Sequence, residues 1–351
     1  MQLGLSLGTW EAGDLADHLA LADEADRLGY AVVWAAEAYG SDAATMLAWI
    51  GARTTRIHLG AGVFQIPARS PAMTAMTAAT LDTLSGGRFR LGLGISGPQV
   101  SEGWHGVRFD EPLGRTREYV ELVRAVLRRE RVAYAGKHFT LPLPDGPGKA
   151  LRLTIKPPRA DLPIYLAAIG PRNLELAGEI ADGWLGIMFS PEHAAASVDR
   201  LRAGRRRSGR PWEGFDLAPT VPVVLGPDVE TCADAVRAYV ALYVGGMGSA
   251  QRNFYNRLVS GMGFEEAAAS VQAAYLDGRP RDAAALLPLD LLDAVALLGP
   301  VGRVAERLHR YADAGVTTLG VTPFARGLPD RVATLRTLAD LIAPANAGGE
   351  R

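Results

Sequence analysis

The sequence predicts an α/β fold in which eight parallel strands and their helices close into a (β/α)8 (TIM) barrel. One unit, a short apolar strand followed by a glycine-rich or polar loop and an amphipathic helix, recurs along the 351 residues. The strands are nearly continuous apolar runs, as expected of strands buried on both faces. Alternating strands and helices are typical of a parallel sheet. An open doubly wound sheet shows the same alternation, so the strand count alone leaves that alternative open.

The predicted strands are separated by segments whose apolar residues recur at helical spacing. The strands cover Leu3–Leu7, Ala31–Glu37, Ile57–Val63, Phe89–Ile95, Ile164–Ala168, Trp184–Met188, Leu217–Leu225 and Thr317–Thr322. The helices cover about Asp14–Leu28, Asp42–Ala52, Pro71–Leu84, Leu113–Arg129, Pro171–Ala181, Pro191–Arg207, Val301–Ala314 and Asp330–Ile342. Ser70 and Pro71 are residue types preferred at an N-cap and a first helical position. The tail from Ala343 to Arg351 is predicted to be frayed.

We interpret residues 1–351 as one domain with two insertions. Residues 132–160 are rich in proline and lack a helical period, which predicts an irregular excursion that contains a hairpin. Residues 228–298 predict a mostly helical insertion. Its aromatic residues Tyr243, Phe254 and Tyr255 form either a lid over the site or an ordinary core.

The composition excludes several functions. A formal net charge of −1 offers no attraction to nucleic acid or to an anionic membrane. The single cysteine, Cys232, excludes a disulfide framework and a cysteine-based metal site, and the histidines lack metal-ligand spacing. Neither a signal-peptide pattern nor an apolar run of about 18 residues is found. We therefore expect a cytoplasmic protein with a small-molecule substrate and no metal, membrane or nucleic-acid partner.

The polar residues of the loops after the strands are the candidates for catalysis, because barrel active sites lie at the C-terminal ends of the strands. Glu37 ends the second strand, where its carboxylate either takes part in proton transfer or caps the next turn. Glu102 and His105 lie in the fourth loop. His105 is either a proton donor or a loop histidine bonded to the backbone. These three residues are the predicted catalytic residues.

Glycines mark the fourth strand and its loop. Gly92, Gly94 and Gly97 weaken a strand unless another group must approach the backbone closely. That group is either a planar cofactor or phosphate, or a neighbouring side chain of the barrel. In the fifth loop, LAAIGPRN, a helix begins at Pro171 and its free N–H groups suit an anion, although a plain turn explains the same residues. No G-x-G-x-x-G in this sequence is followed by the predicted helix and the acidic residue of a Rossmann dinucleotide site, so such a site is not expected.

Long segments of the chain carry a resemblance to a known family. They are LGAGVFQIPARSPAMTAMTAATLDTLSGGRFRLGLGISGPQVSEGWHG, PIYLAAIGPRNLELAGEIADGW and AVVWAAEAYGSDA. The chain resembles the luciferase-like monooxygenase superfamily, and more narrowly its actinobacterial branch that depends on the deazaflavin coenzyme F420. YVGGMG, NFYNRL and LLGPVGRVAERLHRYADAGVTTLGVTP match that branch as well.

The resemblance implies a coenzyme site. Gly62 and Val63, next to Phe64, fall where relatives carry a non-proline cis peptide bond against which the deazaflavin ring rests. Glu37 falls where F420-dependent dehydrogenases place an aspartate near the ring. The positions that match the coenzyme's phosphate-bearing side chain and a second coenzyme contact are Gly92, Gly94, Ile95, Ser96, Gly97, Ala167, Ala168, Ile169 and Gly170.

The sequence departs from the sugar-phosphate dehydrogenases of this superfamily. They carry a histidine where this chain has Ala38 and a glutamate where it has Gly97, so a sugar-phosphate substrate is disfavoured. The resemblance implies a homodimeric F420-dependent oxidoreductase that transfers a hydride to or from a small organic substrate at an activated C=C or C=N bond. The alternatives are an FMN-dependent two-component monooxygenase and a barrel that binds a flavin without catalysis.

Overall fold

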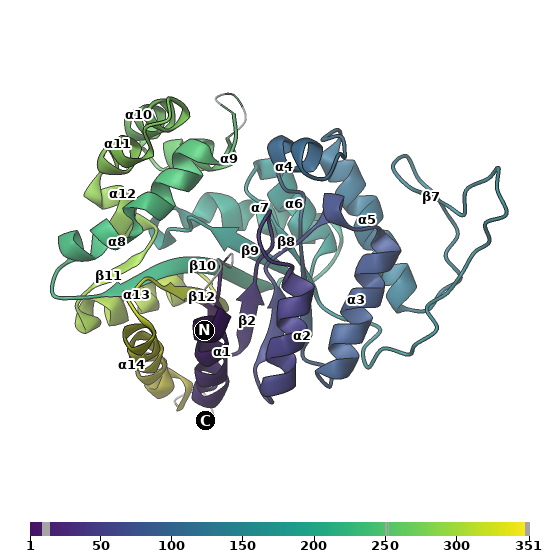
Figure 1. Ribbon diagram of the computed structural model, residues 1–351, viewed down its shortest axis with the longest axis horizontal. Coiled ribbons are helices and arrows are strands. Elements are labelled where there is room, and N and C mark those ends of the chain that lie inside the picture. The colour runs from purple at the N-terminus through teal and green to yellow at the C-terminus, as the bar shows by residue number, and fades with distance from the viewer. Residues whose placement is uncertain (9–14, 250, 252, 348–351) are drawn as a thin grey trace.

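Eight parallel strands close into a barrel in the computed structural model, which describes residues 1–8, 15–249, 251 and 253–347 (Figure 1). The barrel strands are β1 (Gln2–Ser6), β2 (Val32–Ala35), β3 (His58–Ala61), β5 (Phe89–Gly94), β8 (Ile164–Ala167), β9 (Gly183–Ile187), β10 (Asp216–Leu225) and β12 (Thr318–Pro323). The pairing runs in this order, and β10 pairs with both β9 and β12. This closure confirms the predicted barrel and rules out the open sheet.

Helices surround the barrel, close to the predicted positions (Figure 1). They are α1 (Leu15–Leu28), α2 (Ala43–Arg53), α3 (Pro71–Leu84), α5 (Pro112–Leu127), α6 (Pro171–Ile180), α7 (Ala194–Arg207), α13 (Val301–Asp313) and α14 (Leu328–Ala347). Ser70 caps α3 as predicted, because its hydroxyl accepts from the Met73 N–H at 3.1 Å. The expectation of a frayed tail is wrong for residues 343–347, which continue α14, and residues 348–351 lie outside the described residues.

The two insertions differ in kind. The first carries the predicted hairpin, in which β6 (Tyr134–Ala135) pairs antiparallel with β7 (Thr140–Leu141) and projects from the side of the barrel (Figure 1). The second contains α8 (Val229–Ala241), a π-helical turn over Leu242–Gly246, α9 (Phe254–Ser260), α10 (Glu265–Leu276), α11 (Pro280–Ala285) and α12 (Leu289–Ala294). Several short elements were not predicted, among them β11 (Leu297–Gly299), which pairs with β10, and α4 (Pro98–Gly103) in the fourth loop.

The described residues form two large apolar clusters. One lies between the strands and the helices around them, and the other lies within the second insertion. A small third cluster, which comes from the opposite face of β2, β8 and β10, contains Val32, Trp34, Tyr165 and Ala218. The strand β11 joins the two large clusters, because Leu297 packs in the barrel cluster and Leu298 in the insertion cluster. The insertion and α4 stand at the same end of the barrel, so the loops after the strands lie between them (Figure 1).

Candidate active site

The third predicted strand is interrupted at the mouth of the barrel. β3 ends at Ala61, and β4 (Phe64–Gln65) resumes the pairing with β5. The peptide bond between them, Gly62–Val63, is cis, which confirms the expectation drawn from the resemblance. Trp34 of β2 packs against this bend, and a Cβ on Gly62 would lie 3.1 Å from the Trp34 Cβ.

The glycines of β5 are required by contacts within the protein. A Cβ on Gly92 would stand 2.0 Å from the Ala61 carbonyl oxygen and 2.7 Å from Cδ1 of Leu185. A Cβ on Gly94 would stand 2.6 Å from Cγ2 of Val63. Of the two readings of these glycines, close packing inside the barrel therefore accounts for Gly92 and Gly94 without any bound group.

Two other glycines face open space. Gly97 and Gly170 are the N-cap residues of α4 and α6, each is followed by proline, and neither helix start has a side-chain cap. A Cβ on Gly170 would meet nothing within 4 Å, and one on Gly97 would meet only Oε1 of Gln99, at 3.6 Å. Because β5 and β8 are paired neighbours, the two helix starts follow adjacent strands.

The remaining residues of the expected coenzyme site divide by burial. Phe64 and Ala168 are buried like Gly92 and Gly94, and the Ala168 carbonyl accepts from Nε1 of Trp184 at 2.9 Å. The half-buried residues, which keep surface at the mouth, are Gly62, Val63, Ile95, Ser96, Gly97, Ala167, Ile169 and Gly170. Ser96 has a φ of 59°, a left-handed conformation that is uncommon for a side chain other than glycine. Of the twelve positions other than Glu37, eight therefore keep surface that a bound group could contact.

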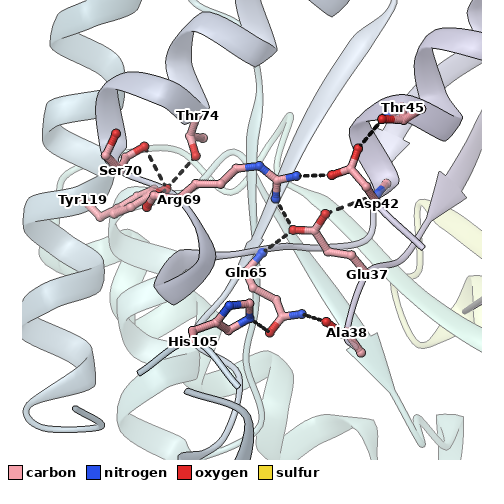
Figure 2. Close-up of polar contacts among 11 residues, drawn as sticks. Glu37, Ala38, Asp42, Thr45, Gln65, Arg69, Ser70, Thr74, His105 and Tyr119 are labelled. Atoms are coloured by element: carbon pink, nitrogen blue, oxygen red, sulfur yellow. Dashed lines mark hydrogen bonds and ion pairs between the residues drawn. The ribbon is translucent and has the colours of Figure 1, made fainter. Parts of the chain in front are cut away.

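Glu37 is held by hydrogen bonds on both oxygens (Figure 2). Oε1 accepts from the Gln65 backbone N–H at 3.1 Å and from Nη1 of Arg69, and Oε2 accepts from the Ala43 N–H at 3.3 Å. Its side chain is only 8% exposed and that of Arg69 only 14%. The carboxylate thus contacts the first residue of α2, which is the capping role considered for it, and ties α2 to β4.

Arg69 connects this carboxylate to a second one. Its Nη2 donates to Asp42 at 2.5 Å, and its guanidinium lies 4.4 Å from the centre of the Phe64 ring. Burial opposes ionisation of Asp42, but hydrogen bonds from Thr45 and the charge of Arg69 outweigh burial and lower the pKa of Asp42. The two acids and the arginine therefore form one ion-pair network beside the mouth (Figure 2).

His105 joins the same neighbourhood through Gln65. Its Nε2 lies 3.3 Å from Oε1 of Gln65, whose Nε2 donates to the Ala38 carbonyl at 2.8 Å (Figure 2). Glu102, in contrast, is exposed, accepts from the Phe109 N–H at 3.0 Å, and lines an open hollow of about 470 Å³ with Ser249 and the start of α4. The structure thus brings Glu37 and His105 to one buried glutamine and leaves Glu102 outside that group.

The aromatic residues of the insertion form a cluster at the mouth. Tyr243 contacts Tyr239 and Tyr255, with ring centres 4.9 and 4.8 Å apart, and Tyr239 stacks edgewise on Phe324, which follows β12. All of them pack against the insertion core, while Phe254 lies apart beside Arg257. Burial raises the pKa of all three tyrosines, so their phenols stay protonated at neutral pH. These tyrosines therefore belong to the core of the insertion, and through Phe324 they also line one side of the barrel mouth.

Sequence reasoning did not single out Gln65, Arg69 and Ser41, although all three lie in the loops after the strands whose polar residues are the candidates. Gln65 is 4% exposed, an unusual burial for an amide, and its position inside the apolar run VFQIP was the available signal. The buried Ser41 hydroxyl has no hydrogen-bond partner among the described residues, in the same loop as Glu37. A polar ligand at the mouth would give the Ser41 hydroxyl a hydrogen-bond partner. The same ligand could occupy the open space beside Gly97 and Gly170. The loop that follows the first strand, from Gly8 to Gly13, belongs to the same set of candidate loops, but its residues 9–13 lie outside the described residues.

These features define an oxidoreductase-type barrel of the luciferase-like class, and the chain belongs to the luciferase-like monooxygenase family, whose model matches residues 2–318. A Mycobacterium tuberculosis protein, assigned by inference to the coenzyme F420-dependent oxidoreductases, is 44% identical over 92% of this chain and 95% of its own length. The 5,10-methylenetetrahydromethanopterin reductase of Archaeoglobus fulgidus is 27% identical over 91% of this chain and 92% of its own. The coenzyme F420-dependent tetrahydromethanopterin reductase structure from Methanopyrus kandleri superposes with a TM-score of 0.82 at 25% identity, covering 98% of this chain and 99% of that one.

Two features are absent from the described residues: a membrane-spanning helix and a metal-binding cluster. None of their helices is long and apolar enough to cross a membrane. Within the same residues, no group of three or more histidine, cysteine, aspartate or glutamate side chains could hold a metal ion.

Proposed function

We propose that this protein is an F420-dependent oxidoreductase that transfers a hydride between the deazaflavin ring and a small organic substrate. The preferred reaction is reduction of an activated C=C or C=N bond. The observation that carries the proposal is the pair of uncovered helix starts, Gly97 and Gly170, after two adjacent strands. Backbone N–H groups at such starts suit the phosphate of the coenzyme. The 44% identical relative named for F420 supports the same choice of coenzyme.

The half-buried residues at the mouth are proposed to hold the coenzyme. Gly62 and Val63 would hold the deazaflavin ring, and Ile95, Ser96, Ile169 and Gly170 would contact the rest of the coenzyme, including its phosphate. Bound F420 supplies or accepts the hydride, and the protein contributes position and proton transfer. In this arrangement Glu37 fixes β4 through its hydrogen bonds, and His105 is the proposed proton carrier. Glu102 lines the open hollow outside this group of residues, and its proposed role is limited to contact with ligands as they enter.

Titration of the purified protein with F420 and with FMN, followed in the visible spectrum, tests this proposal. F420 is expected to bind, and Gly170→Ala is expected to weaken that binding by about tenfold, the effect of losing about 1.4 kcal/mol of contact. Gly302→Ala is the matched control, because a Cβ there also meets nothing within 4 Å and Gly302 is the second residue of α13, outside the proposed site. Tight FMN binding without F420 binding would favour the two-component monooxygenase and refute the proposal. F420 binding without turnover on any acceptor would indicate a carrier barrel.

We also propose a homodimer formed through α2 and α3. These neighbouring helices expose Trp49 (59%), Met73, Met76 and Leu84 (71%), more apolar surface than a solvated helix pair needs. Sedimentation should show a wild-type dimer that Trp49→Arg together with Met76→Arg converts to monomer. Leu143→Arg, on the distant hairpin excursion, is the control and should leave the dimer intact. A wild-type monomer would contradict this proposal.

A further inference from the structure

Gln65 occupies a position that the resemblance does not assign. It is the second residue of β4, and its side chain is almost fully buried. Its backbone N–H donates to Glu37 at 3.1 Å, and its amide nitrogen donates to the Ala38 carbonyl at 2.8 Å. The first bond ties the backbone of Gln65 to the loop after β2, and the second ties its side chain to the same loop (Figure 2). The position of the amide is therefore fixed. What remains to be decided is whether its NH2 group or its carbonyl oxygen faces each partner.

The partners decide the orientation of the amide. A backbone carbonyl only accepts hydrogen bonds, so the NH2 group of Gln65 must face Ala38 and the carbonyl oxygen must face His105. The oxygen Oε1 also only accepts. The nitrogen of His105 that faces it, Nε2, must therefore carry a hydrogen. In the neutral ring this selects the tautomer with the hydrogen on Nε2 and a lone pair on Nδ1.

We propose that Gln65 is a positioning residue that holds His105 in the Nε2–H tautomer, so that the proton exchanged with the substrate passes through Nδ1. The inference rests on the proposed function for its chemistry. Among the described residues Nδ1 of His105 has no hydrogen-bond partner, and the ring is only half-buried. Of the two ring nitrogens, Nδ1 is therefore the one left to bond with an incoming molecule.

The proton step balances with this assignment. Reduction of an activated C=C or C=N bond places a hydride from the reduced coenzyme on one atom and requires a proton on the other. The imidazolium of His105 carries a hydrogen on each nitrogen. When the Nδ1–H bond breaks, its electron pair stays on the ring and the proton forms the new bond to the substrate atom. The ring that remains is the neutral Nε2–H tautomer, which Gln65 accepts without rearranging.

The charged groups around His105 do not touch its ring. Glu102 and Arg108 lie on its own loop and are exposed, and Glu102 accepts from the Phe109 N–H. Across the loop, Glu37 reaches His105 only through Gln65 and is paired with Arg69. The group in contact with Nε2 is thus a neutral amide. A neutral acceptor fixes the tautomer without the added pull of a carboxylate on the imidazolium.

Nitrogen-15 NMR of histidine-labelled protein tests the assignment without any coenzyme. His105 is identified by the signals lost in His105→Asn. At alkaline pH, wild type should show a protonated Nε2 and an unprotonated Nδ1, and Gln65→Met should show a mixture of tautomers. Gln2→Met, an exposed glutamine on β1, should leave the His105 signals unchanged. A protonated Nδ1 in wild type, or an unchanged tautomer in Gln65→Met, would overturn the proposal.

The variant Gln65→Glu provides a second test, which can be made even if Gln65→Met does not fold. A carboxylate accepts from Nε2 as the amide does, so the tautomer should persist, while the pH midpoint of the His105 signals rises by about 1 unit. An unchanged midpoint would contradict the contact between the two side chains. In turnover, Gln65→Met should lower kcat about tenfold with unchanged F420 affinity. If F420 does not bind at all, the proposed function fails, but the NMR result still decides the role of Gln65.

Discussion

Replacing Gly92 with alanine is expected to destabilise the folded protein by about 3 kcal/mol, the upper end of the cost of an extra methyl group in a packed core. The new Cβ would stand 2.0 Å from the Ala61 carbonyl oxygen, which belongs to the backbone of β3 and cannot turn away as a side chain can. Relief requires a shift of β3 against β5. The measurement is urea or thermal unfolding followed by circular dichroism, with soluble yield recorded alongside.

Gly170→Ala is the matched control for this prediction. The same methyl group at Gly170 meets nothing within 4 Å, so its effect on unfolding should stay within about 1 kcal/mol, the range of N-cap substitutions. Equal unfolding midpoints for Gly92→Ala and wild type would show that β5 can shift to accommodate the added methyl group at no cost in stability. The reading of Gly92 as a packing residue would then be wrong.

Replacing Arg69 with methionine is expected to destabilise the protein by about 3 kcal/mol, because breaking a buried ion pair leaves a charge without its partner. Glu37 would keep its bonds from the Gln65 and Ala43 N–H groups but lose the guanidinium. Methionine keeps much of the apolar volume over Phe64, so the loss reports on charge more than on packing. Urea unfolding of the variant measures the effect.

The double variant Arg69→Met with Glu37→Gln separates structure from catalysis. If the pair is structural, removing both charges should recover at least about 1 kcal/mol of the loss, since neighbouring groups are coupled. Glu37→Gln alone should then retain turnover wherever it remains folded. Full stability with abolished turnover in Glu37→Gln would instead make Glu37 a catalytic acid and contradict the structural role.

The barrel could be predicted from the sequence because its signal is local and repeated. Each strand is an apolar run and each helix has its own period, so errors at single boundaries do not accumulate. The missed elements are short: β11 has three residues and α4 has six, too few to show a period. The interruption of the third strand at Gly62 was expected only through the resemblance, since Ile57–Val63 reads as one continuous apolar run.

The sequence predicts at which end of the barrel the site residues lie, but it does not predict which side chains they contact. The loop residues Glu37 and His105 were placed at the correct end of the barrel, because strand direction alone determines that end. The glutamine that joins them lies 28 residues from Glu37 and 40 from His105. Only the closed barrel brings these segments together. The same holds for Gly92, whose packing against Ala61 depends on a neighbour in space rather than in sequence.

The separation of the two apolar cores has a consequence for how this barrel can diversify. The proposed coenzyme contacts stand on strands rooted in the barrel core, whereas the tyrosines that wall the opposite side of the mouth are rooted in the insertion core. Substitutions that reshape the insertion therefore leave the packing beneath Gly97 and Gly170 untouched. If the proposed function holds, changes in the insertion can alter which acceptor is bound without disturbing the packing under the coenzyme contacts, and the short strand β11, which pairs with β10, is where the two cores join.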